Sequence, residues 1–197
     1  MKHKEFDVKT YSIEIGGKTF TFETGKLAEL TSAALMCRCG ETALLVTVVA
    51  SPRPRDGIDF FPLSIDFEEK LYSVGKIPGS YNRREGRAAD KAILNGRLID
   101  RPMRPLFPSN MRNDVAICCT VMSNDPDVQP EIVGMLGASR GVTISDIPFN
   151  GPIAGCSVGL VDGKLIINPN KAQQEASDLA LTVASTAEKV VMIEAGA

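Results

Sequence analysis

The sequence has only one histidine in 197 residues, and this scarcity argues against several classes of enzyme. A Ser-His-Asp or Cys-His hydrolase would have to use His3, which lies outside every predicted core element. The sequence also lacks a GxxxxGK(S/T) phosphate loop and a GxGxxG motif after a strand. Histidine-based hydrolases and the two glycine-rich nucleotide-binding motifs are therefore not indicated.

Long apolar runs are also missing. No segment approaches the length of a membrane span, and residues 1–17 are charged and then alternating, without the apolar core of a signal peptide. We therefore expect a cytoplasmic protein with no membrane partner. Hydrophobic residues make up 44% and charged residues 23% of the sequence, a composition typical of one soluble globular domain.

The cysteines do not have the pattern of a metal site. There are five, an odd number: Cys37, Cys39, Cys118, Cys119 and Cys156. Their spacing is unlike that of zinc ligands, and adjacent Cys118 and Cys119 would point to opposite faces of a strand. We expect reduced thiols packed in the core.

Strand and helix patterns alternate in blocks along the chain. This predicts an α+β (or α/β-like) fold with no linker to a second domain. Gly16-Gly17 predicts a tight hairpin turn, and the nearly all-apolar residues 43–50 predict a central buried strand. Other strands are predicted at 33–38, 60–67, 114–122, 153–161, 165–168, 179–184 and 190–193, and helices at 88–101 and 130–145. The second helix is rich in small residues and should pack closely.

Positive charge is concentrated in residues 76–108. This segment holds eight basic residues, six of them arginine, and three acidic ones, in a chain whose formal net charge is −2. Arginine binds phosphate oxygens through a planar, permanently charged fork that lysine lacks. An arginine cluster on a mildly acidic protein predicts a site for a polyanion.

The basic segment divides into a loop and a helix. Gly75, Pro78 and Gly79 predict an exposed loop at its start. Three apolar residues of the helix are expected to face the core: Ile93, Leu94 and Leu98. Pro102 should end the regular helix near residue 101. Arginines near helix ends often form surface ion pairs worth about 0–1 kcal/mol, so a structural role for them stays open.

Several motifs between residues 60 and 168 resemble the first ribonuclease-PH-type domain of the bacterial polynucleotide phosphorylase family. They are FFPLSIDFEEKLYSVGKIPGS, RREGR, RLIDRPMRPLFP, SNDPDVQPEIVGMLGAS and IPFNGPIAGCSVGLVDGK. GKLAELTSAALMCRCGETALLVTV, nearer the start, fits the same family. The resemblance covers nearly the whole chain. It implies a ribonuclease-PH-type domain over residues 1–197, with mixed sheets packed against helices.

The resemblance also implies an activity for the full-length protein. That family's enzyme is a homotrimer that degrades single-stranded RNA from the 3′ end with inorganic phosphate and releases nucleoside diphosphates. Aspartates of its second domain hold Mg²⁺, whereas the matching stretch of this chain offers only Asp162. Asp125 and Asp127 fit a helix start better than a metal site. We expect no catalytic residue and no metal ligand within this chain.

The resemblance assigns roles to the basic segment. The loop after Gly79 would line the entrance of the trimer's central channel, where RNA threads in. Its expected RNA-binding residues are Tyr81, Asn82, Arg83, Arg84 and Arg87. Tyr81 could stack on a base, whereas Asn82 stands where the family often has an aromatic residue. Four further residues are expected to support the RNA path or active site, with Asp100 orienting an arginine: Arg97, Asp100, Arg101 and Arg104.

Three hypotheses stay open on the sequence alone. The chain is the RNA-binding, non-catalytic part of a phosphorolytic exoribonuclease, or a self-sufficient ribonuclease-PH-like enzyme, or a structural module for trimer assembly. The missing acidic motif favours the first. We also expect a fragment truncated before a closing C-terminal helix, because an apolar strand runs directly into Ala-Gly-Ala.

Overall fold

The computed structural model describes residues 6–196, so His3 lies outside the described residues. Its first sheet has six strands in the order β1-β2-β3-β4-β6-β5. Their bounds are β1 Lys9–Ile15, β2 Lys18–Thr24, β3 Ala33–Cys39, β4 Thr42–Pro54, β5 Leu63–Glu69 and β6 Asn113–Ser123. Neighbours pair antiparallel except β5 and β6, which are parallel. β5 begins later than predicted, since Pro62 has no N–H for a strand ladder.

Local turn chemistry and burial agree with the predicted hairpins. Gly16 and Gly17 connect β1 to β2 with positive φ angles of 59° and 75°, a conformation that glycine adopts without steric cost. The central position of β4 is confirmed, because Leu44, Val46 and Val48 are completely buried between its neighbours and the helices.

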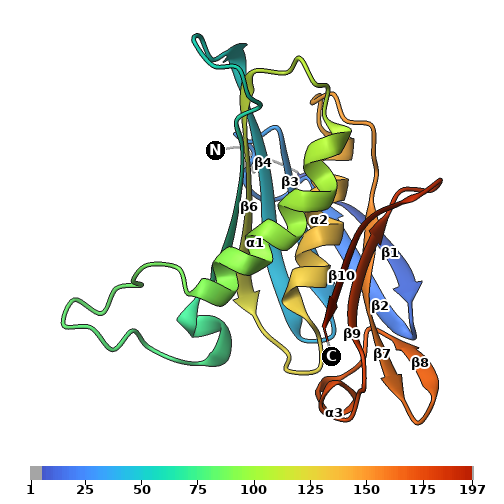
Figure 1. Ribbon diagram of the computed structural model, residues 1–197. Coiled ribbons are helices and arrows are strands. Elements are labelled where there is room, and N and C mark those ends of the chain that lie inside the picture. Colours follow the sequence, from blue (N-terminus) through green and yellow to red (C-terminus); the bar gives the residue numbers. More distant parts are fainter. Residues whose placement is uncertain (1–5, 197) are drawn as a thin grey trace.

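A second, antiparallel sheet has the order β10-β9-β7-β8. Its strands are β7 Ala154–Val161, β8 Lys164–Ile167, β9 Ala180–Ser185 and β10 Val190–Gly196. The α-helices are α1 Asp90–Met103, α2 Pro130–Ile144 and α3 Lys171–Glu175, and two 3₁₀ helices are η1 Leu71–Val74 and η2 Arg104–Leu106. α2 lies between the two sheets, and α1 packs beside it over β5 (Figure 1). The predicted class, mixed sheets packed against helices, is confirmed.

The small residues of α2 allow it to approach the first sheet closely, as predicted. A Cβ atom added at Gly137 would lie 2.6 Å from Cys37 Sγ and 2.9 Å from Val46 Cγ2. One added at Gly141 would lie 2.8 Å from Val48 Cγ2. Since real Cβ atoms do not approach other atoms this closely, the helix–sheet contact requires glycine at these positions.

The prediction for the buried face of α1 was wrong at two positions. Ile93 and Leu94 are 41% and 60% exposed, while Leu98 packs half-buried against the core. The buried face of α1 instead carries the small residues Ala92 and Gly96 in its first half and Ile99 and Met103 in its second. A Cβ atom at Gly96 would lie only 2.8 Å from the backbone oxygen of Ile65, so no side chain fits at this position.

α1 also continues two residues beyond its predicted end. Pro102 lies in the last turn, where its missing N–H removes one helical hydrogen bond, and η2 follows directly. The short α3 has no predicted counterpart. Asn170 begins it with a capping box, in which its side chain and that of Gln173 accept hydrogen bonds from each other's backbone N–H.

The cysteines are free thiols, as predicted. Cys37, Cys39 and Cys119 are buried, and Cys118 and Cys156 are half-buried. Burial raises the pKa of the Cys37 thiol to about 12, so this group stays protonated and behaves as a small apolar side chain. Cys118 and Cys119 do face opposite sides of β6.

Within residues 6–196, no helix has the length and apolar character that crossing a membrane requires.

Candidate nucleic-acid interface

Residues 75–89 leave the body of the protein as one long loop between η1 and α1, at the lower left of Figure 1. Every residue from 79 to 91 is exposed, and the ring of Tyr81 is exposed completely. The predicted exposed loop is therefore confirmed. An exposed aromatic ring next to arginines is the combination that binds unpaired nucleic-acid bases and their phosphates.

The loop is held at both ends by the backbone of Leu71. The N–H of Lys76 donates to Leu71 O over 3.0 Å at the upstream end. At the downstream end, Glu85 Oε1 accepts from the Leu71 N–H over 2.9 Å. The loop therefore leaves the protein and returns to it at a single residue.

Two hydrogen bonds shape the tip of the loop. The N–H of Arg83 donates to Ser80 O over 3.0 Å, and Ser80 Oγ donates to Arg84 O over 3.3 Å. Arg83 has a φ of 50°, in the left-handed region that the backbone of a non-glycine residue adopts only uncommonly. The tip that presents the arginines is thus a closed turn.

The arginines of the loop are not used by the fold. Among the described residues, the guanidinium groups of Arg83, Arg84 and Arg87 form no hydrogen bond or ion pair, and all three side chains are exposed, as is that of Asn82. An arginine without an intramolecular partner retains its five N–H donors for a phosphate. These side chains and Tyr81 form the candidate interface.

Two arginines at the end of α1 are engaged within the fold. Arg104 donates from Nε and Nη2 to Asp100 Oδ2, at 3.1 and 2.9 Å, so the prediction that Asp100 orients an arginine is confirmed. Arg104 also donates to Phe61 O at 3.2 Å and Leu63 O at 3.1 Å, which ties α1 to the start of β5. Arg101 Nη1 pairs with Glu194 Oε2 of β10 at 2.6 Å.

Arg97 differs from these two residues. Its side chain is exposed and, within residues 6–196, has no ion pair or hydrogen bond. The six arginines of the basic segment therefore fall into four with free guanidinium groups and two with intramolecular partners. Any contact of Arg97, Arg101 or Arg104 with RNA stays a prediction.

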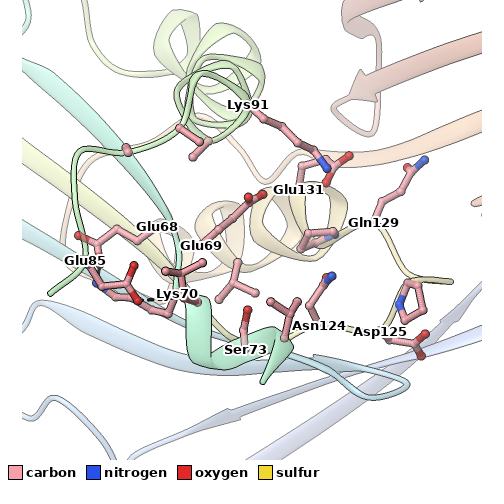
Figure 2. A pocket seen from close by; sticks show the side chains of 18 of the residues that line it. Glu68, Glu69, Lys70, Ser73, Glu85, Lys91, Asn124, Asp125, Gln129 and Glu131 are labelled. Carbon is pink, nitrogen blue, oxygen red and sulfur yellow. Dashed lines mark hydrogen bonds and ion pairs between the residues drawn. The ribbon is translucent and has the colours of Figure 1, made fainter. Parts of the chain in front are cut away.

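A cavity of about 500 Å³ lies beside the base of the loop. Its walls are η1, residues 85–89 of the loop, the start of α1 and the turn that precedes α2 (Figure 2). Charged side chains of both signs line it: Glu68, Glu69, Glu85, Asp125, Glu131, Lys70, Arg87 and Lys91. Sequence reasoning did not find this cavity, because its carboxylates come from segments far apart in the chain and share no spacing pattern.

The pKa values of two charged groups in the cavity are shifted by their surroundings. Burial raises the pKa of Glu131, although Lys91 nearby acts in the opposite direction. Figure 2 shows these two side chains next to one another. A hydrogen bond from Lys70 to Glu68, with Nζ and Oε2 2.7 Å apart, raises the pKa of Lys70. Lys70 therefore stays positively charged, next to the carboxylates of Glu68 and Glu85 in the cavity lining.

The aspartates before α2 are occupied by backbone groups. Asp125 Oδ1 accepts from the Asp127 N–H over 2.9 Å, and Asp127 Oδ1 accepts from the Lys171 N–H over 3.2 Å. Asp125 therefore acts as a turn residue ahead of α2. Asp127 instead accepts from the first residue of α3, and neither aspartate caps α2, so the predicted helix-start role is not seen there. Among residues 6–196, no group of three or more His, Cys, Asp or Glu side chains is arranged to hold a metal ion. The described residues therefore do not fit a magnesium site.

Comparison with known families gives two adjacent matches. Residues 16–148 match the model of the 3′ exoribonuclease family, domain 1, and residues 151–197 match that of domain 2 of the same family. The boundary between them falls in the segment that joins α2 to β7.

Two relatives with similar sequences carry the same name. The polyribonucleotide nucleotidyltransferase of Ruminiclostridium cellulolyticum is 57% identical over 189 residues, and that of Heliobacterium modesticaldum is 56% identical over 190 residues. Each alignment covers 96% of this chain but 27% of the relative. The chain thus spans about a quarter of the length of the curated relatives it matches.

Solved structures share the fold at low sequence identity. Rice (Oryza sativa) Rrp46 superposes with a TM-score of 0.71 at 12% identity, covering 89% of this chain and 79% of that one. A chain of the Archaeoglobus fulgidus exosome with RNA bound to the active site superposes with a TM-score of 0.67 at 14% identity. That match covers 98% of this chain and 78% of the other, and it supports the ribonuclease-PH-type architecture.

Proposed function

The chain belongs to the 3′ exoribonuclease family, and we propose that it is the RNA-binding first core domain of a phosphate-dependent 3′-to-5′ exoribonuclease. In this proposal residues 1–197 are one ribonuclease-PH-type domain of a longer cytoplasmic enzyme. The full-length protein works as a homotrimer and degrades mRNA to nucleoside diphosphates. It binds Mg²⁺ and inorganic phosphate in a second ribonuclease-PH-type domain, outside residues 1–197.

The observation that carries the proposal is the exposed loop. Arg83, Arg84 and Arg87 present guanidinium groups that no side chain of the described part neutralises, and Tyr81 presents a fully exposed ring. Guanidinium groups contact the phosphates of a single strand, while the ring stacks on a base without regard to its identity. The loop is thus suited to grip RNA of any sequence.

The binding test uses the chain, a single-stranded oligo(A) probe and a salt series. Affinity should fall with rising salt, since each neutralised phosphate of a single strand contributes a slope of about −0.7. The double substitution R83A/R84A should weaken binding and reduce the slope by about 1.4. Arg53→Ala is the matched control, because Arg53 is an exposed arginine outside the loop. A salt-independent affinity, or an R83A/R84A variant that binds like the parent, would favour an assembly role instead.

A second assay addresses catalysis. The chain offers no metal-binding cluster among its described residues, so we expect no phosphate-dependent release of nucleoside diphosphates from poly(A) with magnesium. Turnover by this chain at the rate of a full enzyme would contradict the proposal and favour a self-sufficient ribonuclease-PH-like enzyme.

A further inference from the structure

We propose that Glu85 is a positioning residue for RNA binding, because its carboxylate fastens the arginine-bearing loop to the backbone of Leu71. This inference rests on the proposed function of the loop. Glu85 itself is acidic and cannot contact phosphate favourably, so its contribution must come through the arginines beside it.

The geometry explains why a single carboxylate controls the whole loop. Lys70, the residue before η1, makes no side-chain cap, so the first N–H of that helix is supplied with an acceptor by Glu85, fourteen positions along the chain. The other end of the loop is secured by backbone, from Lys76 N–H to Leu71 O. The loop is therefore attached to Leu71 by one hydrogen bond from a side chain, that of Glu85, and by one hydrogen bond between backbone groups.

Arg84 and Arg87 flank the fastened residue directly, and Arg83 lies two positions away in the closed turn. With the Glu85–Leu71 bond in place, the three guanidinium groups are presented from one arrangement of the backbone. Without it, the downstream arm is free to move over the cavity that it borders. Binding would then require the loop to be ordered first, which lowers apparent affinity by the fraction of molecules in the competent arrangement.

Electrostatics alone predicts the opposite change in RNA affinity when Glu85 is replaced, so the two explanations can be told apart. Removing a negative charge from an RNA-binding loop should tighten binding, whether Glu85 becomes alanine or glutamine. The positioning role predicts that Glu85→Ala weakens binding about fivefold, the factor for one ordinary hydrogen bond. Glu85→Gln keeps an oxygen acceptor for the Leu71 N–H, so it should bind at least as tightly as the parent.

A second variant removes the donor instead of the acceptor. Leu71→Pro deletes the N–H at the first position of η1, where proline is tolerated. The residue before it, Lys70, has φ −77° and ψ 136°, which a following proline accepts. L71P should reproduce the weakening seen with E85A, and combining the two should add nothing, because they break the same bond.

The experiment measures affinity for single-stranded oligo(A) against salt, the thermal midpoint and the rate of tryptic cleavage within residues 76–87. For E85A we expect weaker binding, an unchanged salt slope, an unchanged midpoint and faster cleavage. E85A binding as well as or better than the parent would overturn the inference, and so would E85Q weakening binding as much as E85A. A parent chain that does not bind RNA would overturn the proposed function, while the cleavage rates still report whether Glu85 fastens the loop.

Discussion

Replacing Arg104 with alanine separates a structural arginine from an RNA-binding one. The Arg104 guanidinium makes four hydrogen bonds, two to Asp100 and one each to the carbonyls of Phe61 and Leu63. These contacts join the end of α1 to the start of β5. Arg97, in α1 two turns before Arg104, has no such contact among the described residues and serves as the matched control.

The expected loss follows from these contacts. A hydrogen bond to a charged group contributes about 1.5–3 kcal/mol, and an exposed ion pair contributes about 0–1 kcal/mol. The Arg104 side chain is 42% exposed, so water compensates part of the loss. We expect R104A to lower the free energy of unfolding by about 2 kcal/mol, or about 4–8 °C in the thermal midpoint. R97A should stay within about 0.5 kcal/mol of the parent.

Urea denaturation and RNA binding together test this reasoning. R104K should lie between R104A and the parent, because an ammonium keeps the charge but lacks the fork that reaches three acceptors. At low temperature, where R104A remains folded, its affinity for oligo(A) should match that of the parent. An R104A variant as stable as R97A, or one that is stable and has lost RNA binding, would refute the structural role.

Three further predictions concern the interior and the cavity. Gly137→Ala should destabilise the chain by about 1 kcal/mol in urea denaturation, since overpacking against Cys37 exceeds the gain in helix propensity, and a stabilised variant would contradict this packing. Burial raises the pKa of Glu131, so its stabilising share is complete below the ordinary value of 4.5 and is lost as pH rises through the folded pKa. Glu131→Gln should therefore melt higher than the parent at pH 7, with the difference vanishing toward pH 4; a constant difference would argue against it. In thiol titration of the native chain, Cys37 and Cys119 should stay unmodified until denaturant is added, unlike half-buried Cys118.

Features set by neighbouring residues could be predicted from the sequence. The hairpin at Gly16-Gly17 depends on backbone conformations that these glycines adopt locally, and it is present. The apolar strand that became β4 is central because only a strand covered on both sides can be that apolar. The motif resemblance was likewise confirmed by the family match over residues 16–148.

The orientation of α1 could not be predicted, because it depends on a contact between segments distant in sequence. Ile93 and Leu94 have the character of core residues, yet the helix turns another face to β5 and approaches it so closely at Gly96 that no side chain fits there. Helical periodicity shows which residues share a face, but not how close that face comes to its neighbour. The decisive atom is the backbone oxygen of Ile65, which no side-chain pattern reveals.

The same distinction applies to charge. Counting residues gives the basic segment five more positive than negative charges, but the count does not tell which of them a ligand meets. Arg101 is paired with Glu194, 93 positions away, and Arg104 is held by Asp100 and by two carbonyls from before β5 and within it. Because a guanidinium that already donates to a carboxylate has little left for a phosphate, the free guanidinium groups of the segment are those of the loop and of Arg97. Glu85, the acidic residue of that loop, does not neutralise these arginines. Its carboxylate accepts a hydrogen bond from the backbone of Leu71 and, in our proposal, holds the free arginines in place.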